Sequence, residues 1–156
     1  MNILYCGDKP MQKGILLSSM SLIKNVDEPL NIYILTVDYR EKGINYKPVD
    51  KAFAKYLKEK LNKSDIKVNI FLVDVTRYFV EELPEANMQS RFTACCMLRL
   101  FADKTDIKDR VLYLDTDVLC RKDFRDFYYQ NMDGIEIAGV SDYYGRWLFG
   151  DGYINS

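Results

Sequence analysis

The chain contains no histidine among its 156 residues. That absence excludes nucleophilic sites in which a Ser or Cys is activated by His, and it removes the commonest side-chain ligand of transition metals. An excess of positive charge is also missing, because 22 Lys and Arg residues are balanced by 23 Asp and Glu residues, which leaves a net charge of −1. A protein with this balance lacks the basic surface that binds a phosphate polymer, so nucleic acid is not an expected partner.

Long apolar runs are lacking as well, and we expect no leader segment. No stretch approaches the length of a membrane-spanning helix, and residues 1–5 lack the basic and apolar regions of a signal peptide. The cysteines follow neither a disulfide framework nor a C-x-x-C spacing, so we expect them to be reduced and buried. They are Cys6, Cys95, Cys96 and Cys120. Together these features predict a cytoplasmic protein.

The composition that remains is that of a globular protein. Hydrophobic residues make up 48% of the chain and charged residues 29%. We expect one domain over residues 1–156, with no repeat, low-complexity tract or linker. Its chemistry must rest on carboxylates, amides, hydroxyls and cations.

Short apolar runs alternate with amphipathic stretches along the chain. Strands are predicted at 2–6, 31–36, 66–73 and 111–114, and helices at 10–26, 49–62 and 91–102. The segment 123–129 and the apolar stretch 135–140 continue the alternation. This pattern predicts an α/β fold in which a mostly parallel sheet is flanked by helices. Ligands of such sheets bind beyond the carboxyl ends of the strands, where Gly7, Asp8 and the segment 115–117 would lie.

Asp115 and Asp117 form an Asp-x-Asp motif at the end of the predicted strand 111–114. Where the backbone turns after a strand, both carboxylates can reach one hard divalent cation, and substrate phosphates and water complete the shell of Mg²⁺ or Mn²⁺. The chain has no Gly-x-Gly-x-x-Gly after the first strand and no Gly-Lys-Ser/Thr loop, so a metal ion would replace these phosphate cradles. Such an ion offsets charge on a departing diphosphate.

Four segments together resemble family-8 glycosyltransferases, which include lipopolysaccharide galactosyl- and glucosyltransferases and glycogenin. Residues 110–119, Arg-Val-Leu-Tyr-Leu-Asp-Thr-Asp-Val-Leu, resemble the metal-binding segment of that family. Residues 2–8 look like its first strand with the acid that contacts uracil, and 97–100 are similar to its Tyr-x-Arg-Leu helix. Residues 152–156 look like the start of its Tyr-Phe-Asn-Ser/Ala-Gly-Val segment.

The resemblance implies a Rossmann-like nucleotide-diphospho-sugar transferase fold of the A type, with the C-terminal part of the fold missing. It also implies a retaining transferase that moves galactose or glucose from UDP-galactose or UDP-glucose to a saccharide acceptor, with Mn²⁺ or Mg²⁺ as cofactor. Because the third protein ligand in the family is a downstream histidine that this chain lacks, we expect little or no turnover by the chain alone. A shortened sheet would also expose an edge that favours self-association.

Six residues acquire roles through this resemblance. They are Asp8 at the uracil, Arg99 at the donor's sugar or phosphates, Asp115 at the metal and ribose, Asp117 at the metal, Asp142 near the acceptor or donor, and Asn155 at the sugar region. Two positions depart from the family. Met11 stands where an aromatic residue often stacks on the base, and Met97 replaces the Tyr of the arginine motif.

Structural roles compete with each of these assignments. Asp8 could cap the following helix, Arg99 could pair with Asp103 one turn away, and Asp142 could simply begin a loop. Three aromatic residues could form a platform for a sugar or fill a core. They are Tyr143, Tyr144 and Trp147.

Two other functions compete with sugar transfer. Residues 115–118 also resemble the Asp-x-Asp-x-Thr/Val loop of haloacid-dehalogenase phosphatases, in which the first Asp is the nucleophile. That family places its nucleophile after an early strand and needs a Lys and further acids well downstream, for which 117–156 is short. The other alternative is a non-catalytic domain that binds a nucleotide or a protein partner.

Overall fold

The computed structural model describes residues 1–41, 43–62, 65–82, 94–107 and 109–139. These residues form a four-stranded sheet in the order β3-β2-β1-β4, in which every neighbouring pair is parallel. Its strands are β1 (Asn2–Cys6), β2 (Leu30–Thr36), β3 (Val68–Asp74) and β4 (Leu112–Tyr113). The mostly parallel sheet predicted from the alternation of segments is therefore confirmed.

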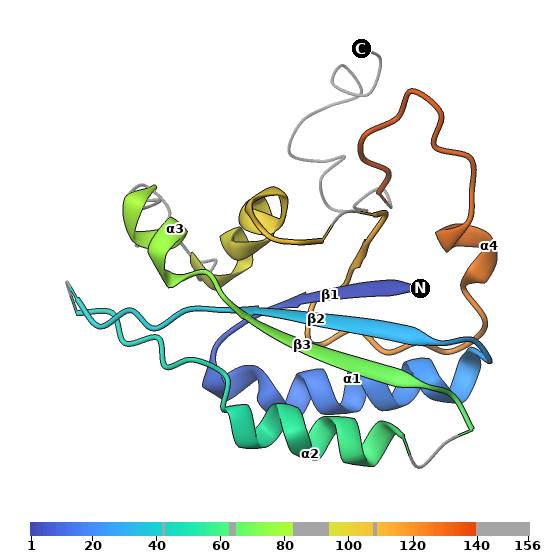
Figure 1. Ribbon diagram of the computed structural model, residues 1–156, viewed down its shortest axis with the longest axis horizontal. Helices are drawn as coiled ribbons and strands as arrows, with labels where there is room; N and C mark the ends of the chain where they lie inside the picture. Colours follow the sequence, from blue (N-terminus) through green and yellow to red (C-terminus); the bar gives the residue numbers. More distant parts are fainter. Residues whose placement is uncertain (42, 63–64, 83–93, 108, 140–156) are drawn as a thin grey trace, which may run out of the picture.

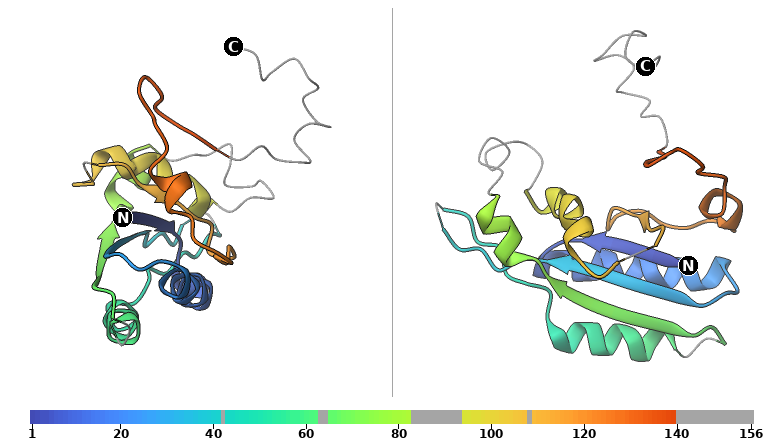
Figure 2. Two further views of the ribbon diagram at one scale, coloured as in Figure 1. Left: turned by 90° about the vertical axis from the view of Figure 1, so that its right-hand side faces the viewer. Right: turned by 45° about the horizontal axis from the view of Figure 1, so that its top comes forward.

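Helices cover both faces of the sheet, which makes three layers (Figures 1 and 2). Two long helices lie on one face, namely α1 (Gln12–Asn25) and α2 (Lys51–Leu61). The opposite face carries α3 (Thr76–Glu81) and the 3-10 helix η3 (Ala94–Lys104). Two short helices complete the described chain, η1 (Lys9–Met11) before α1 and α4 (Arg125–Tyr128) after β4.

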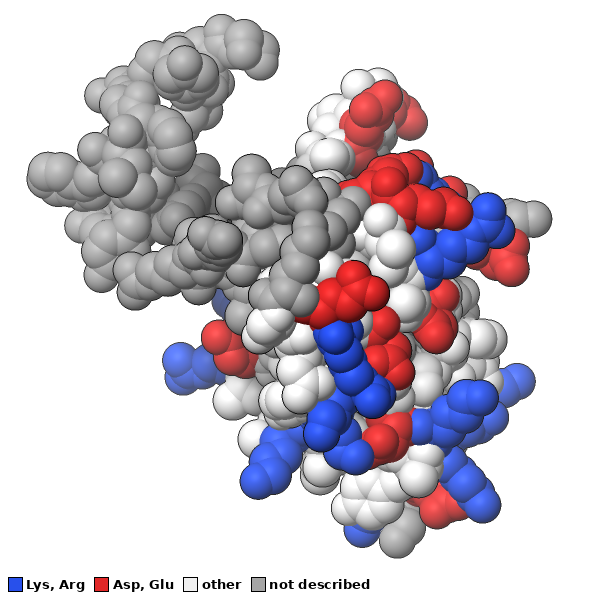
Figure 3. Space-filling model, turned by 90° about the vertical axis from the view of Figure 1, so that its left-hand side faces the viewer, with Lys and Arg blue, Asp and Glu red and all other residues white. Residues whose placement is uncertain are grey.

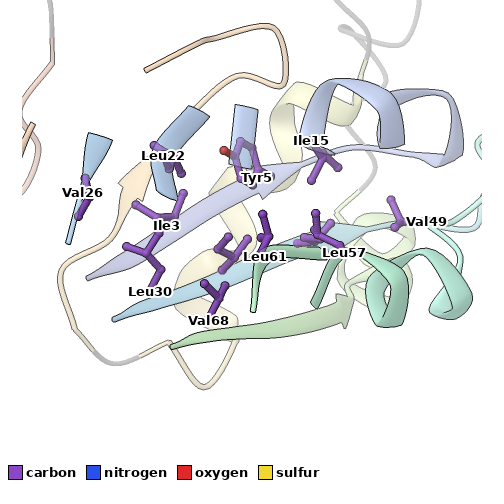
Figure 4. Close-up of a cluster of buried hydrophobic side chains, with 12 residues drawn as sticks. Ile3, Tyr5, Ile15, Leu22, Val26, Leu30, Val49, Leu57, Leu61 and Val68 are labelled. Atoms are coloured by element: carbon purple, nitrogen blue, oxygen red, sulfur yellow. The ribbon is translucent and has the colours of Figure 1, made fainter. Parts of the chain in front are cut away.

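The sheet separates two hydrophobic cores. Successive residues of a strand point to opposite faces, and in β1 the buried side chains of Ile3 and Tyr5 contribute to the core under α1 and α2, shown in Figure 4. Leu4 and Cys6 contribute to the second core, under α3 and η3. Burying one large aliphatic side chain stabilises a fold by about 1.5–3 kcal/mol, so β1 is fixed from both sides.

A row of asparagines aligns three strands. The Nδ2 of Asn31 donates to Oδ1 of Asn2 at 3.0 Å, and the Nδ2 of Asn69 donates to Oδ1 of Asn31 at 2.9 Å. These residues are direct partners in the ladders of β1, β2 and β3. Because a slip by one residue would turn every side chain of a strand to the other face, the row supports the register that the apolar pattern sets.

Several details differ from the sequence-based predictions. The helix α3 was not predicted, and the helix predicted at 91–102 is a 3-10 helix over Ala94–Lys104, with residues 91–93 outside the described part. Residues 135–139 form no strand, and the side chain of Ile137 is 87% exposed. An apolar run becomes a strand only when another strand accepts its backbone hydrogen bonds, and no described strand pairs with this run.

The cysteines are only partly as expected. All four are free, but Cys96 and Cys120 are half-buried, whereas Cys6 and Cys95 are buried. Within the described ranges, no helix is long and apolar enough to cross a bilayer.

Candidate functional site

The two acidic segments follow adjacent strands at the same edge of the sheet. Strand β4 pairs in parallel with β1, and the N–H of Leu114 donates to the carbonyl of Leu4 at 3.0 Å, so the chain is still held to β1 just before Asp115. Asp8 leaves the same edge two residues after Cys6, where β1 ends. Figure 3 views the molecule from this side and shows acidic and basic side chains interspersed over the described surface.

Asp8 is nearly buried, with 7% of its surface exposed. It precedes η1 but makes no side-chain hydrogen bond that caps this helix, so the capping role considered above is not realised. Burial raises the pKa of the Asp8 carboxyl, against a smaller lowering effect of a hydrogen bond to its own backbone. A carboxyl kept from water in this way can accept a hydrogen bond from a ligand at little further cost in desolvation.

Tyr113, at the end of β4, links Asp115 to Arg99. Its hydroxyl donates to Oδ1 of Asp115 at 2.5 Å, and the guanidinium carbon of Arg99 lies 5.0 Å from the centre of its ring. Burial, followed by the hydrogen bond to Asp115, raises the pKa of Tyr113, so the phenol remains a donor at neutral pH. One side chain therefore contacts two residues to which the sequence assigns a donor-binding role.

Arg99 is exposed on η3, and its guanidinium lies over the ring of Tyr113. Among the described residues it forms no ion pair, so the predicted alternative, a pair with Asp103, is not formed. Its positive charge also opposes the rise that burial causes in the pKa of Cys6, whereas the charge of Asp115 adds to that rise. Arg99, Asp115 and the end of β1 thus lie within electrostatic reach of one another.

Asp115 and Asp117 flank a tight turn beyond β4. The N–H of Val118 donates to the carbonyl of Asp115 at 3.1 Å, and both acidic side chains are exposed. The turn approaches the first turn of α1 so closely that a methyl group on Gly14 would lie 2.5 Å from the carbonyl oxygen of Thr116. Glycine at position 14 is what allows this approach.

The chain after the turn is tied to α1. The N–H of Cys120 donates to Oγ of Ser21 at 2.8 Å, and Nδ2 of Asn25 donates to the carbonyl of Cys120 at 3.1 Å. The turn is thus held at both ends, by β1 before it and by α1 after it. Such support favours a fixed position for side chains that hold a ligand.

Two contributions to this arrangement were not predicted from the sequence. Tyr113 and Gly14 both touch the Asp-x-Asp turn, yet neither was proposed as a site residue. For Tyr113 a signal existed, since residues two apart in an extended segment share a face and the tyrosine stands two residues before Asp115. For Gly14 the sequence shows only a glycine inside a helical pattern, which can have a packing reason but does not indicate the packing partner.

Thiol chemistry is not favoured at this edge. Burial is the main cause that raises the pKa of Cys95 to about 12 and that also raises the pKa of Cys6. Since the thiolate is the reactive form, these thiols are inert at neutral pH. Asp142 and Asn155 lie outside the described residues, as do Tyr143, Tyr144 and Trp147.

A metal ion here would need ligands from outside the protein. Among the described residues, no group of three or more Asp, Glu, Cys or His side chains is placed to hold an ion. Two exposed carboxylates at a strand end nevertheless match how Mg²⁺ and Mn²⁺ bind, through one or two carboxylates completed by substrate phosphates and water. The oxygen ligands present therefore fit an ion that binds together with a diphosphate.

Comparison with known proteins identifies relatives of this chain. The family model described as glycosyl transferase family 8 matches residues 2–153. No protein of curated function matches the sequence. Two crystal structures of LgtC are similar to it, one of an active-site mutant and one of the galactosyltransferase in complex with donor and acceptor sugar analogs. Each has a TM-score of 0.65 at 19% identity, and each match covers 85% of this chain but only 43% of the LgtC chain.

Proposed function

The chain belongs to glycosyl transferase family 8, and on that premise we propose that it binds a UDP-hexose and serves its transfer to a saccharide acceptor. The hexose is galactose or glucose, and the configuration at its anomeric carbon is retained. The observation that carries the proposal is that Asp8, Arg99 and Asp115 gather at the carboxyl ends of β1 and β4. Ligands of open parallel sheets bind at this edge.

The two site residues Asp8 and Arg99 would each bind a different part of the donor. The nearly buried carboxyl of Asp8 accepts a hydrogen bond from the uracil. Arg99, whose guanidinium forms no ion pair within the described residues, offers its charge to the diphosphate or the sugar. Two further residues lie outside the described part: Asp142 is proposed to contact the acceptor or donor, and Asn155 the sugar region.

We propose Asp115 and Asp117 as the residues that hold Mn²⁺ or Mg²⁺ beside the diphosphate. Such an ion, when bound, stabilises the negative charge that develops on the leaving UDP. The chain's own contribution is to hold the Asp-x-Asp turn and Arg99 in fixed positions around the diphosphate. The Asp-x-Asp turn is anchored to β1 and α1, and Arg99 adds a positive charge on the side of η3.

Thermal unfolding with UDP tests this proposal. A ligand at a concentration about 100 times its Kd stabilises the folded state by about 2.7 kcal/mol, so UDP with Mn²⁺ should raise the Tm by several degrees. With a chelator the shift should largely disappear. Asp117→Asn should abolish it too, because an amide is a neutral and weaker ligand for a hard cation.

Asp126→Asn is the matched control. Asp126 is an exposed acid on α4, close to the chain's N-terminus and away from the strand ends that carry the site (Figure 1). This variant should keep the full metal-dependent shift. A UDP shift of equal size with chelator, or in Asp117→Asn, would contradict the proposal. A shift with a phosphate mimic but none with UDP would favour a phosphatase.

A further inference from the structure

Tyr113 occupies a distinctive place between two side chains of the proposed donor site. Its hydroxyl is bonded to one oxygen of Asp115, and its ring face carries the guanidinium of Arg99. The hydrogen bond engages Oδ1 of the carboxylate, whereas Oδ2 makes no hydrogen bond to another described residue. Hydrogen bonds of this kind orient a metal-binding carboxylate and set its affinity.

The position of the Tyr113 ring is itself well determined. Tyr113 pairs with Leu4 in the ladder between β4 and β1, and the next N–H is bonded to the Leu4 carbonyl. The ring packs against the core under η3, the helix that supplies Arg99. A side chain held by the sheet and by a core can hold its partners in turn.

We propose that Tyr113 is the positioning residue of the donor site, with two separable actions. Its hydroxyl orients the Asp115 carboxylate for the divalent cation, and its ring holds the Arg99 guanidinium toward the diphosphate. This inference rests on the proposed function. It extends that proposal from the ligands themselves to the residue that sets their geometry.

Two substitutions separate the two actions. Tyr113→Phe removes the hydroxyl and keeps the ring, so Mn²⁺ affinity in the presence of UDP should fall by about 10- to 100-fold, the usual effect of losing a group that orients a metal ligand. UDP affinity at saturating Mn²⁺ should stay nearly unchanged. Tyr113→Leu removes the ring as well, so UDP affinity at saturating Mn²⁺ should also fall.

Tyr33→Phe is a close control because Tyr33 pairs with the same residue, Leu4, from the other side of β1. Tyr33 therefore lies in the same row of the sheet and packs against the same core. Its ring stacks on Phe71 with 4.8 Å between ring centres, away from Asp115 and Arg99. Removing its hydroxyl should leave the affinities for Mn²⁺ and UDP at wild-type values.

The measurements are Mn²⁺ binding by electron paramagnetic resonance and UDP binding by calorimetry, on chains whose ligand-free Tm is compared first. If wild type binds Mn²⁺ and UDP and Tyr113→Phe binds Mn²⁺ equally well, the positioning role is overturned while the proposed function stands. Equal loss of Mn²⁺ affinity in Tyr33→Phe would also overturn it, because the effect would then be a general one of the sheet. If wild type shows no metal-dependent UDP binding, the proposed function fails and this inference fails with it.

Discussion

Replacing Gly14 by alanine should displace the Asp-x-Asp turn without unfolding the protein. A methyl group at this position would lie 2.5 Å from the Thr116 carbonyl oxygen and 3.2 Å from its carbonyl carbon. Both atoms belong to the backbone, so rotation of a side chain cannot relieve the contact. Bringing the oxygen to an ordinary contact of 3.4 Å requires a movement of about 0.9 Å.

The turn is the part that should move. Helix α1 is fixed in the core by Ile15 and Leu22, which are 0% and 1% exposed. The turn at 115–118 is held by β1 before it and by α1 after it, and both of its acidic side chains are exposed. Binding groups must be held within about 0.5 Å of their productive positions, and an error of about 1 Å can cost about 100-fold in rate. We therefore expect the affinity for UDP in the presence of Mn²⁺ to fall by on the order of 10-fold or more.

Stability should change much less than binding. Alanine is favoured over glycine in a helix by about 1 kcal/mol, which offsets part of the about 1–3 kcal/mol that overpacking costs. The assay is calorimetric titration of UDP with and without Mn²⁺, accompanied by the Tm of the ligand-free chain. Gly139→Ala is the matched control, because a methyl group there meets no atom of the described residues within 4 Å.

Wild-type affinity in a folded Gly14→Ala chain would refute this reasoning, since it would mean that the turn tolerates the displacement. A loss of the same size in Gly139→Ala would refute it as well. In that case the effect would come from replacing any glycine and not from the contact with Thr116.

Two further predictions concern the core. Leu22→Ala should lower the free energy of unfolding by about 2–5 kcal/mol in urea titrations, because Leu22 is 1% exposed, whereas Leu17→Ala on the same helix should change it by less than about 0.5 kcal/mol, because Leu17 is 60% exposed. Burial raises the pKa of Tyr5 to about 12, while an unfolded tyrosine ionises near about 10. The folded state therefore keeps a proton that the unfolded state loses, so the stability that this group contributes is intact below about pH 10 and is lost as the pH approaches about 12, by up to about 2–3 kcal/mol. In urea titrations over that pH range, the free energy of unfolding of Tyr5→Phe should decline less steeply than that of wild type. Its value below about pH 10 should be lower, because the hydrogen bond to Ser18 is gone. Parallel declines in the two proteins would contradict the argument.

The central strands and long helices could be predicted because their apolar patterns are strong and local. Strand β1 has the bounds predicted for it, 2–6. The ends of α1 and α2 lie within one to two residues of the predicted ends. Strand β4 is shorter than predicted, because only Leu112 and Tyr113 pair with β1. The helix α3 has six residues, which is too short for a helical period to stand out.

In the candidate site, too, features that rest on local sequence patterns could be predicted, and contacts between separate segments could not. That Asp8 and Asp115 follow strands could be read from the runs before them, and the parallel order then placed both at one edge. Their roles as ligands stay predictions. The contact of Gly14 with Thr116 joins segments that lie far apart in the sequence, and no local pattern reports which backbone approaches a helix. The stacking of Arg99 on Tyr113 could not be predicted either, because it joins two separate elements, η3 and β4.

The two layers of helices act on the Asp-x-Asp turn from opposite sides. From the layer of η3, Arg99 stacks on Tyr113, whose hydroxyl is hydrogen-bonded to the Asp115 carboxylate. From the layer of α1, Gly14 sets how deeply the backbone of the turn can sit. Because these contacts involve different atoms, a carboxylate and a carbonyl, their effects should be separable. Tyr113→Phe should lower the affinity for Mn²⁺ and leave the affinity for UDP at saturating Mn²⁺ nearly unchanged. Gly14→Ala should shift the whole turn and lower both affinities.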